Sequence, residues 1–131
     1  MAQHAIELIL MRQLATCLAM PVFLVDPKGT LLYFNEPAEA ILGQRFDEAG
    51  EMPAEHWSTI FKPTNESGGP MSAESLPLMI ALTECRPAHG GFWILGLDRA
   101  VRHIEVTAFP LIGIAGRFVG AVAIFWETPA A

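Results

Sequence analysis

Residues 21–43 restrict the fold of this chain more than any other segment. An apolar run at 22–25 ends in Asp26 and is followed by Pro27 and Gly29, and a second apolar run returns at 31–34. Proline presets φ for a turn and glycine supplies a positive φ, so these residues predict a reversal of the chain. The segment therefore begins with a β-hairpin whose strands span 22–26 and 30–34.

A short helix is predicted to follow the hairpin directly. Asn35 is a strong N-cap residue, because its side chain can accept a hydrogen bond from the first turn of a helix. Pro37 falls in that first turn, where its missing N–H costs nothing, and Gly43 suits the left-handed residue that ends a helix. The helix is expected between Asn35 and Gly43.

Two more helices are predicted in the middle of the chain. One lies within the polar, Gly- and Pro-rich residues 44–72, and its apolar face comprises Trp57, Ile60 and Phe61. The other opens with Ser-Ala-Glu-Ser at 72–75 in the manner of a capping box, spans 74–85 and ends near Cys85.

The last third of the chain has the alternation of β-strands. Apolar residues recur with a period of two, which predicts strands at 91–97, 100–109 and 117–126. Two strands, three helices and three strands in that order do not form an alternating βαβ pattern. The order predicts an α+β domain in which an antiparallel sheet carries helices on one face.

Residues 4–19 predict an amphipathic helix with a wide apolar face. At about 100° per residue its apolar side chains cover an arc of roughly 200°, whereas packing on one core needs only somewhat more than about 100°. The helix is therefore expected to contact its own domain and a second copy of the chain. The alternative is a helix folded wholly into its own domain. The candidate dimer interface comprises Ile6, Leu10, Met11, Leu14 and Leu18.

The composition fits a single apolar, acidic domain. Hydrophobic residues make up 52% of the 131 residues and charged residues 17%, so we expect a subunit interface or an internal cavity to take up the excess. The net charge of −6 argues against a nucleic-acid partner. The absence of a spanning apolar run argues against a membrane, and with no secretory signal the expected localisation is cytoplasmic. Cys17 and Cys85 lack metal-ligand spacing and are expected to be free and partly buried, with no metal site.

Three local patterns over residues 12–126 resemble PAS domains, which are small sensory and interaction modules. These are the hairpin and helix at 21–43, Phe-Lys-Pro at 61–63 with the helix at 76–82, and the strands at 102–111 and 116–120. The resemblance implies a five-stranded sheet in the order 2-1-5-4-3, with short helices on one face, an N-terminal helix, and a pocket between sheet and helices. It also implies dimerisation through the helix that precedes the first strand.

The resemblance divides the chain into an N-terminal helix at 1–19, which is the expected dimer interface, a PAS domain at 20–127 and a tail at 128–131. The usual effector domain of such proteins is not expected within these 131 residues. The chain begins with Met1 and stops about where an effector linker would start, which favours a stand-alone regulator over an excised domain.

The resemblance leaves the cofactor unknown, since PAS domains bind haem, flavin, small acids, lipids or nothing. A flavin photoreceptor of this family carries an Asn-Cys-Arg-Phe-type motif, and this chain has none, because Cys85 with Arg86 lies at a helix end. A haem member is expected to carry a His on the helix that spans 74–85 here, which contains none. We therefore expect neither haem nor flavin photochemistry.

Large apolar side chains are expected to converge between the helices and the sheet. Packed tightly they are an ordinary core, and otherwise they surround a pocket for a small apolar ligand. The candidates are Phe34, Trp57, Phe61, Met79, Ile80, Trp93 and Phe125.

The sequence thus favours a non-enzymatic signalling module that senses a small molecule, docks a downstream signalling protein, or does both as a PAS homodimer. One alternative is a structural adaptor with a filled core and no ligand. Another is a small α+β enzyme acting on a hydrophobic substrate, in which His103 and Glu105 serve as acid and base. The motifs of serine hydrolases, zinc proteases and phosphate-binding loops are absent from the sequence, which gives no catalytic residue beyond that pair.

Overall fold

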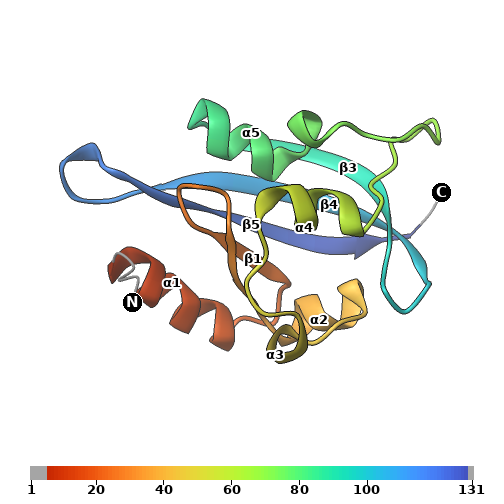
Figure 1. Ribbon diagram of the computed structural model, residues 1–131, viewed down its shortest axis with the longest axis horizontal. Helices are drawn as coiled ribbons and strands as arrows, with labels where there is room; N and C mark the ends of the chain where they lie inside the picture. Colours follow the sequence, from red (N-terminus) through yellow and green to blue (C-terminus); the bar gives the residue numbers. More distant parts are fainter. Residues whose placement is uncertain (1–5, 130–131) are drawn as a thin grey trace.

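A five-stranded antiparallel sheet forms the centre of the computed structural model, which describes residues 6–129 (Figure 1). The strands lie in the order β2-β1-β5-β4-β3, which confirms the expected topology. Their bounds are Val22–Val25 for β1, Leu31–Phe34 for β2, Ala88–Leu95 for β3, Val101–Ile112 for β4 and Phe118–Thr128 for β5.

Helices cover both faces of this sheet. On one face α5 contacts β3, β4 and β5, and on the other α1 contacts β1 and β5 (Figure 1). The short helices therefore share one face, as predicted, and the N-terminal helix covers part of the opposite one. The helices are α1 Ile6–Cys17, α2 Glu36–Leu42, α3 Phe46–Ala49, α4 Ala54–Ile60 and α5 Pro77–Glu84, with 3₁₀ turns η1 Ala73–Ser75 and η2 Ile114–Gly116.

Alternation along β5 separates two apolar cores. Ala121, Ala123 and Phe125 belong to the cluster between the sheet and the short helices, which we call the inner core. Val122 belongs to the cluster between the sheet and α1, the outer core, and Ile124 packs against it. Successive strand residues point to opposite faces, so β5 is buried on both sides and reads as a continuous apolar run.

Asn35 caps α2 as predicted and also joins three elements. Its Oδ1 accepts hydrogen bonds from the backbone N–H of Val22 (2.9 Å) and of Ala38 (3.3 Å). Its Nδ2 donates to the carbonyl oxygens of Ala15 (2.8 Å) and Met20 (2.9 Å). The end of α1, the start of β1 and the start of α2 are therefore held by one buried side chain.

The predicted capping box at 72–75 is wrong. Ser72 makes no side-chain cap hydrogen bond, and α5 begins only at Pro77. The residue before a proline is disfavoured in helical geometry, and Leu76 accordingly has extended backbone angles. The chain makes one 3₁₀ turn, straightens at Leu76, and then begins a shorter helix than predicted.

Several element boundaries also differ from the predicted ones. The strand expected at 91–97 runs over Ala88–Leu95, and β4 and β5 continue to Ile112 and Thr128. α3 was not predicted, because its four residues carry no helical period. Of the N-terminal helix predicted at 4–19, residues 4 and 5 lie outside the described part of the chain. Between residues 6 and 129, no helix is long and apolar enough to cross a membrane.

Candidate functional site

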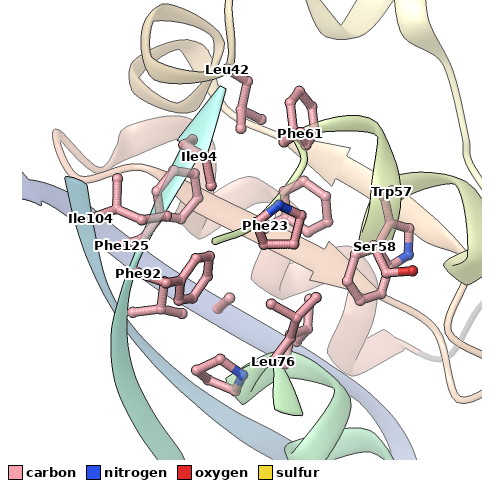
Figure 2. Close-up of a pocket in the computed structure, with 15 residues that line it drawn as sticks. Phe23, Leu42, Trp57, Ser58, Phe61, Leu76, Phe92, Ile94, Ile104 and Phe125 are labelled. Atoms are coloured by element: carbon pink, nitrogen blue, oxygen red, sulfur yellow. The ribbon is translucent and has the colours of Figure 1, made fainter. Parts of the chain in front are cut away.

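A cavity of about 80 Å³ lies in the inner core, between the sheet and the segments around α4 and α5 (Figure 2). The strands line the cavity with one face of the sheet only, because β3, β4 and β5 each contribute every second residue to the cavity wall. The lining residues are Phe23, Leu42, Trp57, Ser58, Phe61, Pro63, Leu76, Pro77, Leu78, Phe92, Ile94, Ile104, Val106, Ala123 and Phe125.

Trp57 is held in place at the cavity wall by two contacts. Its indole Nε1 donates a hydrogen bond of 2.7 Å to the carbonyl oxygen of Gly29 in the hairpin turn. Its ring meets Phe23 edge to face, with centroids 5.5 Å apart. The bond to Gly29 uses the only polar atom of the Trp57 side chain, so this residue presents an apolar surface to the cavity.

The cavity wall is almost entirely apolar. Of its fifteen lining residues only Ser58 has a side-chain hydroxyl, and none is charged or is a His, Cys, Asn or Gln. Burying a polar group without a partner costs several kcal/mol, roughly 2–7, and a charge far more. The wall therefore suits an uncharged apolar molecule with no more than one hydrogen-bonding group.

Three of the seven predicted pocket residues line this cavity: Trp57, Phe61 and Phe125. Phe34 is fully buried and stacks on Phe23 at 6.0 Å, one layer behind the wall. Met79 and Ile80 are partly buried on α5, and neither lines the cavity.

Trp93 lies on the opposite face of the sheet from the cavity. Its neighbours Phe92 and Ile94 line the cavity, so alternation directs Trp93 outward, where its ring meets His103 with centroids 4.9 Å apart. Phe92 and Trp93 are both large and aromatic, and the sequence does not show which of them faces inward. In the structure Phe92 pairs with Ile104 of β4, and both side chains line the cavity, so Phe92 is the residue that faces inward.

The described part of α1 exposes three of the five predicted interface residues. Ile6, Leu10 and Leu14 are 63%, 56% and 51% exposed, while Met11 and Leu18 pack against the outer core. Spacing of four residues places the exposed three on one side of the helix. Ile9, which was not predicted, is also exposed. We call Ile6, Ile9, Leu10 and Leu14 the α1 stripe.

His103 and Glu105 share the outer face of the sheet but have different partners. The ring nitrogens of His103 lie 2.6 Å from Glu66 Oε1 and 2.5 Å from Thr128 Oγ1. Glu105 pairs instead with His89, at 3.2 Å. Both groups lie away from the cavity, and in residues 6–129 no cluster of three or more His, Cys, Asp or Glu is arranged to hold a metal.

Solved structures that resemble this fold include PAS and LOV domains. The PAS domain of a protein from Colwellia psychrerythraea matches with a TM-score of 0.63 at 16% identity, over 93% of this chain and 97% of that one. The PAS domain of BvgS from Bordetella pertussis matches at 0.59 and 14% identity, over 95% and 87%. A LOV protein from Rhodobacter sphaeroides matches at 0.73 and 12% identity, over 95% and 69%. No family model and no curated protein matches the sequence. The chain therefore has the PAS fold.

The residues of the cavity do not fit a flavin or a haem. A flavin ring carries several carbonyl and nitrogen groups that need partners, and the wall offers one serine hydroxyl. A haem iron needs an axial ligand, and no lining residue is a His or Cys. Cys17 and Cys85 are exposed and lie outside the cavity, which corrects the expectation that they are partly buried.

Proposed function

We propose that this chain is a non-enzymatic signalling module that senses a small apolar molecule in its inner-core cavity. The apolar wall between the sheet and α4 is the observation that carries the proposal. A fully packed core needs no such space, because protein interiors approach the density of organic crystals. The fold supports the proposal, since PAS domains are sensory modules.

The size of the cavity sets the size of the ligand. A dry cavity of about 150 Å³ takes up benzene or xenon. At about 80 Å³ this cavity accommodates xenon or a short hydrocarbon as it stands, and a single aromatic ring with small shifts of the wall. The proposed ligand class is therefore neutral molecules of up to about six heavy atoms.

β1 supports a route from the cavity to the opposite face of the sheet. Phe23 lines the cavity, and its neighbours Val22 and Leu24 belong to the outer core beneath α1. Val22 also donates its N–H to Asn35, which bonds in turn to the end of α1 at Ala15. A ligand that shifts the packing of Phe23 would shift the equilibrium between two positions of α1. The size of that shift is set by the difference between the ligand's affinities for the two arrangements.

The α1 stripe is the proposed docking surface for a second copy of the chain. Its four large apolar side chains lie on a helix whose opposite side is already packed on the sheet. Large exposed apolar patches commonly mark interaction sites. Dimerisation through this stripe would place the reporting helix at the interface, where a downstream signalling protein could detect its movement.

Xenon and benzene test the sensor proposal. NMR titration of the full chain is expected to show saturable binding of xenon, with shifts at Phe23, Trp57 and Phe125. Ala123→Leu places added carbon atoms in the cavity and is expected to abolish binding while the protein stays folded. Val101→Leu, at a 64%-exposed position on β4, is the matched control and should bind as the wild type does.

The small volume of the cavity favours a second candidate, a structural adaptor that binds no ligand. In that case α1 docks a partner and the inner core serves only stability. If the folded wild type binds neither xenon nor benzene, the sensor proposal is contradicted and the adaptor proposal remains.

A further inference from the structure

A second hollow, of about 280 Å³, lies between the end of α4 and the β3–β4 turn. It differs from the inner-core cavity in having two charged residues in its wall. Its lining residues are Ile60, Lys62, Leu95, Gly96, Leu97 and Arg99. Pockets for small molecules begin at about 300 Å³, so the space is close to that of a small-ligand site.

The positive charges of Lys62 and Arg99 are not compensated by the residues around them. Neither forms an ion pair with an acidic side chain of residues 6–129, although the whole chain carries a net charge of −6. Asp98 stands beside Arg99 in sequence, but it accepts hydrogen bonds from Arg102 at 2.8 and 3.2 Å. The hollow therefore presents two positive charges that an added anion can pair with.

Both charged residues also have unusual backbone geometry. Lys62 has φ 46° and Arg99 has φ 70°, in the left-handed region that residues other than glycine rarely adopt. They are two of the four such residues in the described part of the chain. Such geometry persists only where the surrounding structure imposes it. The backbone hydrogen bonds at the end of α4 and in the β3–β4 turn therefore fix the positions of the Cα atoms that carry these two side chains.

The rest of the wall is apolar. Ile60 and Leu95 are partly buried and Leu97 is 40% exposed, and together they give the hollow a hydrocarbon surface next to its two cations. Inorganic anions gain nothing from such a surface. An anion with a hydrocarbon chain gains from both parts of the wall.

We propose that this hollow is a second ligand site, and that it binds a small organic carboxylate. The carboxylate lies between Lys62 and Arg99, and the hydrocarbon part lies on Ile60, Leu95 and Leu97. This site is separate from the apolar cavity, whose wall cannot accept a charge.

The same two segments line the hollow and the inner-core cavity. Phe61 lies in the cavity wall between Ile60 and Lys62, and Ile94 lies in it next to Leu95. A hydrogen bond of 2.8 Å from the N–H of Leu95 to the carbonyl of Phe61 joins the segments. Binding in the hollow would restrain this wall and so change the affinity of the cavity, which gives the module a second input.

Calorimetric titration of the full chain with hexanoate tests the site. The wild type is expected to bind one hexanoate per chain. Lys62→Asn with Arg99→Asn removes both charges, while asparagine still tolerates a left-handed φ, and is expected to weaken binding at least about tenfold. The control, Lys28→Gln with Arg86→Gln, removes one Lys and one Arg elsewhere and should bind as the wild type does. The cavity variant Ala123→Leu should still bind one hexanoate per chain, with an affinity that differs from that of the wild type only by the coupling between the two sites.

Four results would overturn the proposal. They are no hexanoate binding to the wild type, equal binding to the Lys62/Arg99 variant, equal binding of the neutral hexanamide, and equal binding of inorganic phosphate. If the double variant does not fold, Lys62→Gln alone takes its place, and Lys62→Arg is expected to retain binding because it keeps the charge.

Discussion

Asn35 is the residue on which most of the local structure depends. It uses both ends of its amide and is 1% exposed. Removing it strands the buried N–H of Val22 and takes its donor from the Met20 carbonyl, each at a cost of about 1–3 kcal/mol, besides the loss of a helix cap. The Ala15 carbonyl keeps a hydrogen bond from the N–H of Leu18.

We predict that Asn35→Ala lowers the free energy of unfolding by about 3 kcal/mol or more, measured by urea denaturation. Asn65→Ala is the matched control, because the Asn65 side chain also accepts several hydrogen bonds but in an exposed loop. It should cost no more than about 1 kcal/mol. Equal losses in the two variants would contradict the role assigned to Asn35.

Asp98 makes stability depend on pH in the acid range. Hydrogen bonds from the Arg102 guanidinium lower the pKa of Asp98 from 3.8 to about 2. A carboxyl whose folded pKa is lowered stabilises the protein above its unfolded pKa, and this contribution is lost as the pH falls from about 4 to about 2.

Asp98→Asn is therefore expected to lower the urea midpoint at pH 5 and to flatten its fall between pH 4 and pH 2. Asp47→Asn serves as the control, since the ion pair of Asp47 with Arg45 is 68% exposed at both ends and should contribute little. A wild-type pH profile that Asp98→Asn leaves unchanged would show that the pair with Arg102 does not stabilise the fold.

At the scale of elements, β5 meets α1 and β1 closely at Gly120. Its φ is 148°, and a Cβ there would overlap the carbonyl oxygen of Val25 and the side chain of Leu8. Gly116, with φ 74°, has open space where its Cβ would stand. The two glycines thus separate the cost of crowding from the cost of backbone conformation.

We expect Gly120→Ala to destabilise the protein by about 2 kcal/mol more than Gly116→Ala, measured by thermal unfolding. Gly116→Ala should cost about 1 kcal/mol from backbone strain alone. If the two variants have the same melting temperature, α1 and β5 are packed less closely at Gly120 than described.

The α1 stripe gives a prediction about oligomeric state. Leu10→Gln with Leu14→Gln replaces two exposed apolar side chains and leaves Leu8 and Ala15 in the outer core untouched. Light scattering is expected to show a dimer for the wild type and a folded monomer for the variant. Val101→Gln, at a 64%-exposed position at the start of β4, should remain dimeric. A dimeric double variant would place the interface elsewhere.

Local signals in the sequence predicted most elements and fewer of the site residues. The cap at Asn35, the stop at Gly43 and the alternation of the last strands act within a few residues, so they can be read from the chain alone. The inward residue of the Phe92–Trp93 pair depends on pairing with β4, which the sequence does not display. Pro77 did carry a signal against the capping box, because it disfavours helix at Leu76.

At the scale of the whole molecule, two proposed ligand sites and the helix α1 are arranged around a single sheet. The wall of the inner-core cavity is almost entirely apolar, and the hollow beside it carries two positively charged residues. α1 lies on the opposite face of the sheet (Figure 1). It is connected to the inner core through β1 and the hydrogen bonds of Asn35. The proposed function requires that a ligand in the inner-core cavity, on one face of the sheet, change the packing of α1 on the other face.

Amide hydrogen exchange of α1, with and without a saturating apolar ligand, tests this requirement most directly. Xenon or benzene in the wild type is expected to change the protection of the amides at Leu8 to Leu18, and Ala123→Leu should abolish the change. If ligand binds and alters protection only at Trp57, Phe61 and the other cavity residues, the cavity is not coupled to α1 and the sensor mechanism is wrong.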